Sequence, residues 1–346
     1  MSHSALVRAI ACATFALCLC VVVLGAYVRL SNAGLGCPDW PGCYGHLTPA
    51  AAAADAHTLS EPLAGRILNV GKAWREMVHR YAAGTLATLI IALAVLTAVW
   101  RRERIVAPRY TAALVAIVLF QAVLGALTVT RQLKPLIVTS HLLFGFTTLA
   151  LLWWLVLTLW WRQRPGTAAA AAPIAGRGAI RVTRTLAVAG LCLLALQITL
   201  GGWTSSNYAA IACPDLPTCQ GSWWPDADFR SAFVLWRDLD IDYEGGVLAN
   251  SARVAIHLTH RAGALLITLA LLLAASAAVR RRNHSRIRLA AGFVFVALAL
   301  QLTIGISMVW RGFPLWLATA HNAGAALLLL ATLALYRALS LTHEPT

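Results

Sequence analysis

The sequence CPDWPGC at residues 37–43 returns as CPDLPTC at residues 213–219, and this repetition indicates the architecture of the protein. Each copy starts twelve residues after a glycine near the end of an apolar run, Gly25 before the first and Gly201 before the second. Further landmarks repeat in the same order: His79-Arg80 and His260-Arg261, Gln121 with Gly125 and Gln301 with Gly305, and Thr139-Ser140-His141 and Thr319-Ala320-His321. We infer that the chain contains two copies of one unit.

The composition places both copies in a membrane. Of the 346 residues, 60% are hydrophobic and 12% are charged, whereas an ordinary soluble domain has about 25% charged residues. A soluble enzyme, a disordered chain and a secreted disulfide-rich module are thereby excluded. Eight stretches without Asp, Glu, Lys or Arg approach or exceed the roughly 20 residues that cross a bilayer: Ala9–Val28, Tyr81–Trp100, Tyr110–Thr130, Pro135–Trp161, Thr185–Thr204, Ala262–Val279, Leu289–Trp310 and Gly312–Tyr336. The second and sixth should begin a turn or more earlier and so include residues 76–80 and 257–261.

These runs predict an all-α polytopic membrane protein with eight transmembrane helices, arranged as two pseudo-symmetric four-helix bundles. Equivalent points lie four helices apart, so both copies cross the membrane in the same direction. We expect an N-terminal bundle at residues 1–164 and a C-terminal bundle at residues 183–346. Residues 165–182, rich in Ala, Pro, Gly and Arg, should form a cytoplasmic linker between them.

Arginine clusters set the expected orientation. They follow the second, fourth and sixth apolar runs, which places those loops and both termini in the cytoplasm of a bacterial inner membrane. The net charge of +15 is therefore largely a topology signal, and no basic face suited to nucleic acid is present. The long loop after residue 204 carries over half of the thirteen acidic residues, which we interpret as a solvated surface. A cleaved signal peptide is the alternative reading of the first apolar run, against which the repeat argues.

Four histidines occupy matching depths. His79, His141, His260 and His321 each lie one to two turns inside the external end of a helix that runs from outside to inside. Ionisable side chains within a membrane are costly and usually functional. Zinc needs four ligands, whereas haem iron takes two axial ligands on opposite faces of a flat apolar ring. Small residues after each histidine favour haem, with a hydrogen bond to a neighbouring helix as the alternative.

One carboxylate breaks the symmetry of the two copies. Glu76 precedes the histidine of its helix by three residues, and His257 holds that position in the second copy. We interpret this as a division of labour, with chemistry in the first half and a permanent redox centre in the second. Glu76 could act as a base or stabilise a developing cation, or it could only pair with Arg75 or Arg80.

The arginines beside two of the histidines need partners in the membrane. Arg80 and Arg261 directly follow His79 and His260. A guanidinium group at this depth either extends to the lipid headgroups or pairs with a haem propionate, to which it can bind in a bidentate manner. The residues alone leave both readings open.

The paired cysteines lie just outside the predicted membrane boundary. Cys37 with Cys43, and Cys213 with Cys219, should each form a local disulfide bond on the oxidising side of the membrane. Zinc binding by all four thiols is the alternative. The spacing is not that of covalent haem attachment.

Together these residues resemble the haem A synthase (haem O oxidase) family, of the bacterial type with paired cysteines in the external loops. The stretches that carry the resemblance are Gly25-Ala26-Tyr27-Val28-Arg29-Leu30, Glu76-Met77-Val78-His79-Arg80, His141, His260-Arg261 and His321. The resemblance implies a haem b between His260 and His321, haem O as substrate at His79 and His141, and Glu76 as the essential acid. The implied reaction oxidises the C8 methyl group of haem O to the formyl group of haem A in successive two-electron steps, with oxygen from water. The implied partners are the haem O synthase and the cytochrome oxidase assembly machinery.

The main alternative function is a di-haem b membrane cytochrome that passes electrons without changing a haem. Both functions predict haem held by two histidines, but only the synthase would yield formyl haem from haem O. A transporter is less favoured because the histidines lie near the external side and not at the membrane midplane. A non-enzymatic assembly factor gives no reason for Glu76.

Overall fold

A computed structural model describes residues 2–55, 57, 60, 62–161, 174–237, 241–281 and 284–341. In this part of the chain eight helices are long and apolar enough to cross a membrane, as the sequence predicts, and no extended strand is present. They are α1 (His3–Leu30), α4 (Val70–Val99), α5 (Pro108–Thr130), α6 (Pro135–Trp161), α7 (Ile174–Ser206), α9 (Asn250–Val279), α10 (Ser285–Trp310) and α11 (Leu315–Ser340). The short elements are α2 (Pro49–Ala54), η1 (Arg101–Glu103), η2 (Ala210–Ala212) and α8 (Phe229–Ala232).

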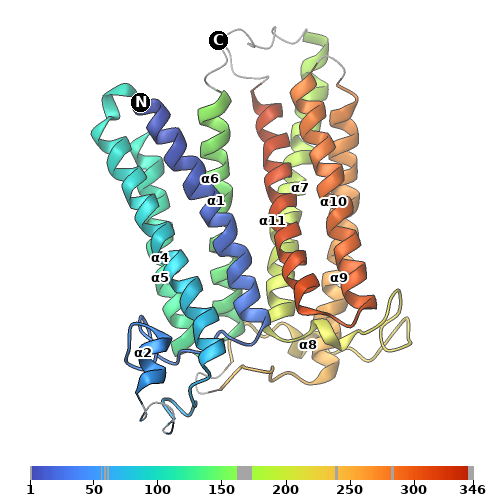
Figure 1. The fold of residues 1–346 in the computed structure, drawn as a ribbon. Helices are drawn as coiled ribbons and strands as arrows, with labels where there is room; N and C mark the ends of the chain where they lie inside the picture. Colours follow the sequence, from blue (N-terminus) through green and yellow to red (C-terminus); the bar gives the residue numbers. More distant parts are fainter. Residues whose placement is uncertain are drawn as a thin grey trace.

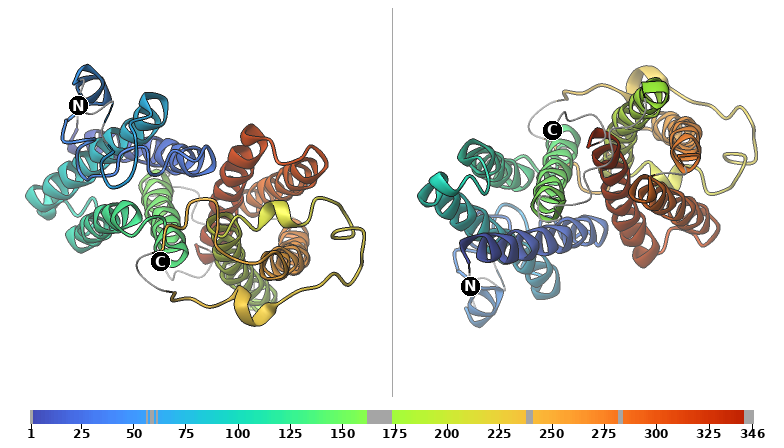
Figure 2. Two further views of the ribbon diagram at one scale, coloured as in Figure 1. Left: turned by 90° about the horizontal axis from the view of Figure 1, so that it is seen from below. Right: turned by 90° about the horizontal axis from the view of Figure 1, so that it is seen from above.

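The long helices fall into two groups of four. Viewed from either end, α1, α4, α5 and α6 form one group and α7, α9, α10 and α11 the other (Figure 2). Within each group the helices contact one another in a closed ring, α1–α4–α5–α6 and α7–α9–α10–α11. The arrangement is consistent with the two repeated bundles expected from the sequence. The start of α1 and the end of α11 lie at one end of the molecule, and α2 and α8 at the other (Figure 1).

The two helices predicted to begin early do so. The first residue of α4 is Val70, and the Asn69 side chain before it accepts a hydrogen bond from the backbone N–H of Lys72 at 3.0 Å. Such a cap satisfies one of the free N–H groups of the first turn. In the second half α9 begins at Asn250. The polar residues around each His-Arg pair therefore lie on regular helix and not in a loop.

The predicted linker is shorter than expected at its C-terminal end. Residues 165–173 lie outside the described part of the chain, but the remainder of the 165–182 segment belongs to α7, which begins at Ile174. Its Ile180 side chain is buried in the main apolar core. Arg281 donates to the carbonyl oxygen of Ala179 at 3.1 Å and contacts the Thr183 hydroxyl at 3.3 Å. This packing extends the helix through a segment whose composition suggested a flexible connection.

The two groups of helices join along α1, α6, α7 and α11. Contacts run between α1 and α11, α6 and α7, and α6 and α11. In this junction the Trp153 indole N–H donates to the carbonyl oxygen of Leu330 at 2.9 Å. Near the loops, the Arg29 guanidinium lies 4.4 Å from the centre of the Tyr208 ring and donates to its hydroxyl at 3.0 Å. The halves are thus held together both within the apolar region and at the loop end.

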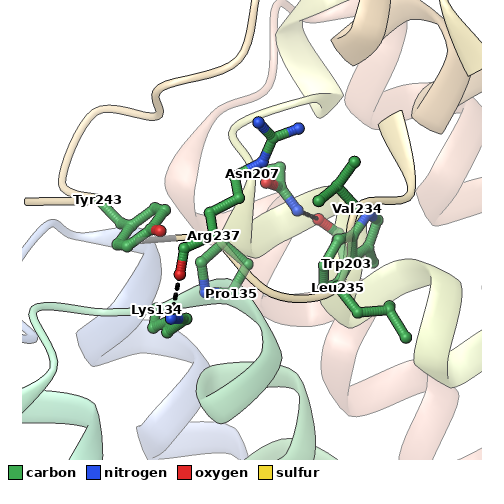
Figure 3. A pocket seen from close by; sticks show the side chains of 8 residues that line it. All are labelled: Lys134, Pro135, Trp203, Asn207, Val234, Leu235, Arg237 and Tyr243. Atoms are coloured by element: carbon green, nitrogen blue, oxygen red, sulfur yellow. Dashed lines mark hydrogen bonds between the residues drawn. The ribbon is translucent and has the colours of Figure 1, made fainter. Parts of the chain in front are cut away.

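A small pocket lies where the loops meet this junction. Its lining comes from the start of α6, the end of α7 and the following loop (Figure 3), and consists of Lys134, Pro135, Trp203, Asn207, Val234, Leu235, Arg237 and Tyr243. The Lys134 ammonium donates to the carbonyl oxygen of Arg237 at 2.5 Å and lies 3.5 Å from the centre of the Trp236 ring. None of the four candidate histidines lines this pocket.

The long loops of the two halves are joined by ion pairs. Arg66 contacts the carboxylates of Asp242 and Glu244 at 2.5 Å each, and Lys72 lies 3.8 Å from Glu244. Between the two acids, Tyr243 is buried and its N–H donates to the carbonyl oxygen of Gln132 at 3.1 Å. The interpretation of the acidic segment as a purely solvated surface is therefore wrong for Asp242 and Glu244. Their partners lie about 175 residues away in sequence, beyond the reach of a local charge pattern.

Replacement of Arg66 by alanine should weaken the connection between the loops without unfolding the protein. The side chains of Arg66 and Asp242 are 22% and 48% exposed, so we expect a loss of about 1 kcal/mol or less. Thermal unfolding in detergent should show a small decrease of the melting temperature that shrinks at high salt. Arg109→Ala is the matched control, because Arg109 is exposed near the other end and no ion pair to it is found in the described residues. Equal melting temperatures for Arg66→Ala and the unmodified protein at low salt would contradict this role.

Candidate functional site

The four histidines lie on diagonally opposed helices. His79 and His141 belong to α4 and α6 of the first ring, and His260 and His321 to α9 and α11 of the second. The rings of His260 and His321 have their centres 6.5 Å apart and their planes at 77°. In the first half, His79 lies within electrostatic range of His141. The second half therefore brings two imidazoles together from opposite sides of a ring of helices, and the two histidines of the first half lie on the equivalent pair of helices.

The geometry of the second pair fits two axial ligands of one metal ion. A histidine nitrogen binds a transition metal at about 2 Å, so two imidazoles on opposite sides of one ion have ring centres about 6 Å apart. The observed 6.5 Å is close to this separation. Among the described residues, no group of three or more His, Cys, Asp or Glu side chains could hold a metal ion. The two-ligand site suits a metal that arrives with its own planar ligand, as iron does in haem.

A glycine of the preceding helix lies against each histidine ring. A Cβ atom built on the glycine would meet the nearest ring atom at 3.0 to 3.5 Å, in the pairs Gly25 with His79, Gly125 with His141, Gly201 with His260, and Gly305 with His321. Contacts of 3.0 Å are too close for a real Cβ atom without movement of the ring. Glycine at positions 25, 201 and 305 therefore lets the Cε1 edge of each imidazole approach a neighbouring backbone closely.

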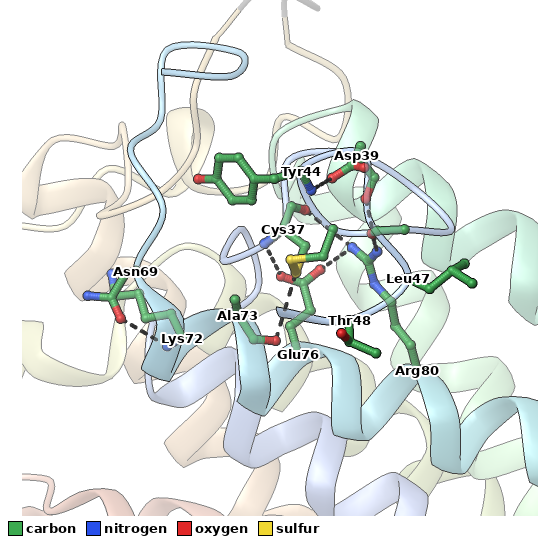
Figure 4. The surroundings of a disulfide bond; sticks show 12 residues. Cys37, Asp39, Tyr44, Leu47, Thr48, Asn69, Lys72, Ala73, Glu76 and Arg80 are labelled. Carbon is green, nitrogen blue, oxygen red and sulfur yellow. Dashed lines mark hydrogen bonds and ion pairs between the residues drawn. A yellow bond between two sulfur atoms is a disulfide. The ribbon is translucent and has the colours of Figure 1, made fainter. Parts of the chain in front are cut away.

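The Glu76 carboxylate is buried directly beneath the first disulfide loop. Its side chain is 6% exposed; Oε2 accepts from the backbone N–H of Cys37 at 2.9 Å, and Oε1 pairs with Arg80 at 2.5 Å (Figure 4). Of the two arginines considered as partners from the sequence, the structure selects Arg80 over Arg75. Two charge-assisted hydrogen bonds fix this carboxylate in one orientation.

Arg80 and Arg261 each donate hydrogen bonds to backbone carbonyl groups of the disulfide loop of their own half. Arg80 donates to the carbonyl oxygens of Cys37, Asp39 and Gly42 at 3.2, 2.9 and 2.6 Å. Its counterpart donates in the same way at 2.8 to 3.0 Å, with Arg261 bound to the carbonyl oxygens of Cys213, Asp215 and Thr218. Sequence reasoning considered headgroups and propionates and missed these partners. The sequence did contain a signal for this contact, because each copy of the repeat has both the arginine and the disulfide loop.

The disulfide pairing is the one expected from the sequence. Bonds join Cys37 to Cys43 and Cys213 to Cys219, with Cα atoms 4.7 and 4.6 Å apart. The bonded sulfurs leave no thiolates for the alternative zinc site. We conclude that the cysteines shape the two loops.

An aspartate stabilises the fold of each loop. The Asp39 carboxylate accepts from the N–H groups of Tyr44 and Gly45 at 2.6 and 2.9 Å. The second loop repeats this arrangement, with Asp215 accepting from the N–H groups of Gln220 and Gly221. Hydrogen bonds lower the pKa of Asp215, first that from the Thr218 hydroxyl and then those from the backbone.

Comparison with known proteins agrees with this geometry. The COX15-CtaA family model, described as a cytochrome oxidase assembly protein, matches residues 8–333. The chain belongs to the COX15-CtaA family. It is 40% identical over 317 residues to the heme A synthase of Shewanella oneidensis, with 92% of each chain covered. The heme A synthases of Methylobacterium radiotolerans and Halalkalibacterium halodurans are 28% and 26% identical, with 92% and 87% of this chain and 86% of each relative covered.

In this COX15-CtaA chain, His257 takes the position of Glu76 in the second half. Its side chain is buried, and its ring meets that of Phe313 edge-on with centres 6.2 Å apart. His260, one turn later, is the residue whose ring faces His321. The contact geometry therefore favours His260 over His257 as the partner of His321.

Sequence reasoning also missed a polar neighbour of the second pair. Gln197 lies four residues before Gly201 on α7, the same spacing as the repeated Gln121 with Gly125 and Gln301 with Gly305. Its amide nitrogen is 3.0 Å from Nδ1 of His260. The shared spacing was a usable signal for this contact.

A side chain at position 305 should displace the ring of His321. A Cβ atom there would lie 3.0 Å from Cε1 of the ring, and a branched side chain adds to the overlap. We expect Gly305→Val to lower the affinity for haem at least tenfold, the order of loss when the support of a metal ligand is removed, and so to reduce the haem retained after purification. Gly292→Val, on the same helix with no atom within 4 Å of the added Cβ, should bind haem normally. Haem extraction and quantification compares the two, and equal haem contents would rule out this placement of the site.

Proposed function

We propose that this chain is a heme A synthase that converts haem O to haem A. The observation that carries the proposal is the unequal pair of sites: both halves have two histidines on opposed helices, and among the described residues a buried carboxylate accompanies only the first pair. The relative from Shewanella oneidensis, which bears that name and aligns over 92% of both chains, supports it. An electron carrier would need the histidines but not the acid.

The overall change at the substrate carbon is a four-electron oxidation. A methyl group and one water molecule yield a formyl group, four protons and four electrons. In two equal steps the methyl group becomes first a hydroxymethyl group and then, with loss of two more electrons and two protons, the aldehyde. The oxygen atom comes from water, so the site needs a group that orients water and accepts protons, and a route for electrons.

We assign the substrate haem to the N-terminal half, residues 1–164, with His79 and His141 as its axial ligands. Glu76 lies one turn before His79 on the same helix and is held by Arg80 and by the N–H of Cys37. In this orientation the carboxylate would stabilise positive charge at the carbon being oxidised or orient the attacking water. The overlying disulfide loop would limit access of other water to the site.

We assign a resident haem b to the C-terminal half, residues 183–346, between His260 and His321. A haem held there would supply one-electron transfer away from the substrate. The buried Nε atom of Arg261 has no hydrogen-bond partner in the described residues, which supports contact of this guanidinium with a propionate. The terminal nitrogens of Arg80 make more hydrogen bonds than those of Arg261, and one of them goes to the Glu76 carboxylate. A propionate contact of Arg80 therefore has less support.

We place the protein in the bacterial plasma membrane with both termini in the cytoplasm and the haem sites toward the outside. The arginine distribution supports this orientation, and the disulfide bonds agree with an oxidising environment at that end. A haem O synthase is the enzyme class that must supply the substrate. The cytochrome oxidase assembly machinery would receive the product.

Co-expression with a haem O source tests the activity directly. Pigments extracted from such cells and analysed by mass spectrometry should contain haem A, because the proposed reaction leaves a formyl group on the porphyrin. Cells with the haem O source alone are the control. Abundant bound haem without any haem A would instead indicate the electron-carrying di-haem cytochrome.

Replacement of Glu76 should separate chemistry from haem binding. We expect Glu76→Gln and Glu76→Ala to lower the rate of haem O conversion by about 100-fold or more, the usual effect of removing a catalytic acid–base or electrostatic group. The optical spectrum of haem b in the second half should be unchanged. Arg75→Gln is the matched control, since Arg75 is the exposed neighbour of Glu76. Conversion at the unmodified rate in both Glu76 variants would refute the assigned role.

A further inference from the structure

Three of the four histidines have a glutamine partner from the preceding helix. Each glutamine lies four residues, about one helical turn, before the glycine that contacts the ring: Gln121 on α5, Gln197 on α7 and Gln301 on α10. In the first half the amide of Gln121 donates to the carbonyl oxygen of His141 at 3.0 Å. The recurrence in three helices shows that these contacts belong to the repeated unit.

In the second half the glutamines also contact the imidazole rings. The amide nitrogen of Gln197 lies 2.9 Å from the carbonyl oxygen of His260 and 3.0 Å from its Nδ1 atom. The amide nitrogen of Gln301 lies 3.3 Å from Nε2 of His321. Both rings that face each other across the second site are therefore held by an amide.

Glycines on the histidine helices make room for these amides. A Cβ atom at Gly263 or Gly324 would lie 2.2 Å from Oε1 of Gln197 or Gln301. These glycines follow His260 and His321 by three residues. A residue larger than glycine at position 263 or 324 would therefore clash with the glutamine side chain.

The fourth histidine lacks this partner. Val21 of α1 takes the place four residues before Gly25, and its side chain is part of the apolar core. The Nδ1 atoms of His79 and His141 are both buried without a hydrogen-bond partner in the described residues, but His141 is held through its backbone carbonyl oxygen by Gln121, whereas no glutamine contacts His79. On its helix Ala82 occupies the position three residues after the histidine, where α9 and α11 have glycines, so the combination of glutamine and glycine is absent there. The exception falls on the helix that carries Glu76.

We propose that Gln197 and Gln301 are positioning residues that fix His260 and His321 as permanent axial ligands, and that Val21 leaves His79 as an exchangeable ligand. This rests on the proposed function, and it identifies which ligand of the first half yields when haem O enters and haem A leaves. A histidine that binds a metal through one nitrogen usually donates the N–H of the other to an acceptor, which fixes the ring and raises its basicity. The Oε1 atoms of both glutamines are buried without a partner in the described residues. A half-turn of the amide, which exchanges its oxygen and nitrogen, directs that oxygen to the imidazole N–H; in Gln197 this turn replaces the bond from the amide nitrogen to the carbonyl oxygen of His260 and requires the amide to shift away from that oxygen.

The asymmetry matches the different demands on the two sites. A permanent redox centre needs ligands that do not dissociate, whereas a substrate site must release its product at every turnover. Loss of such a hydrogen-bond partner typically weakens metal binding by 10- to 100-fold. His79 without an amide would thus hold its haem more weakly than His260 or His321.

The test measures haem affinity and reduction potential in the purified full chain reconstituted with haem b. Gln197→Leu should weaken binding by 10- to 100-fold and raise the reduction potential, because a less basic ligand stabilises the oxidised iron less. A tenfold effect confined to the oxidised form corresponds to about 59 mV for one electron. Gln197→Glu, with a stronger acceptor, should lower the potential. Gln301→Leu and Gln301→Glu should repeat this pattern and serve where a Gln197 variant does not fold.

Leu196→Ala is the matched control, since Leu196 precedes Gln197 and is exposed on the outer face of α7. A purely structural role would change stability in the leucine and glutamate variants without moving their potentials in opposite directions. Unchanged potentials, or shifts of the same sign, in the Gln197 and Gln301 variants would overturn the proposal.

A gain of the missing partner provides an independent test. Val21→Gln should add an amide beside His79 and slow the release of haem from the first half by at least tenfold, with no change in the potential of the haem in the second half. Unaltered release would refute the role of Val21. These readouts do not depend on turnover, so shifted potentials in a protein that makes no haem A would refute the synthase function alone. A protein that binds no haem would overturn both.

Discussion

A guanidinium group within a membrane protein must find hydrogen-bond acceptors, and this requirement organises both halves of the molecule. Arg80 and Arg261 find them in the backbone carbonyl groups of the disulfide loops. Neighbouring residues of a helix point about 100° apart, so fixing the direction of each arginine also fixes the direction of the adjacent histidine. The loops thereby orient the imidazoles of His79 and His260 toward the middle of their helix rings. The disulfide and the aspartate within each loop keep those carbonyl groups in place.

Two substitutions on this common framework distinguish the halves. The first half has Glu76 where the second has His257, and Val21 where the second has Gln197. The first change adds a carboxylate that is held by the loop itself, through the N–H of Cys37. The second removes the amide partner of one histidine. Both changes affect His79 and its surroundings, which concentrates the asymmetry of the molecule at one site.

Much of this could be predicted from the sequence because the repeat supplies an internal comparison. The eight spans, the early starts of α4 and α9 and the two disulfides follow from patterns of apolar residues and cysteines. Contacts that depend on distant loops could not be predicted in this way. The pairing of Arg66 with Asp242 and Glu244 requires knowledge of how the two long loops lie against each other. The start of α7 depends on the burial of Ile180, which composition alone does not reveal.

The junction between the halves determines how the two sites are related in space. The helix of His141 contacts the helix of His321, so one ligand-bearing helix of each half packs against the other. The indole N–H of Trp153 donates across this contact to the carbonyl oxygen of Leu330. Lipid offers no replacement for such a bond, because it has no hydrogen-bonding groups at this depth. Rotation of one half relative to the other would leave the indole N–H without an acceptor in an apolar environment, at a cost that water cannot offset. The separation between the two histidine pairs is therefore set by the protein itself, which is what a fixed route for electrons between the proposed substrate site and the proposed redox centre requires.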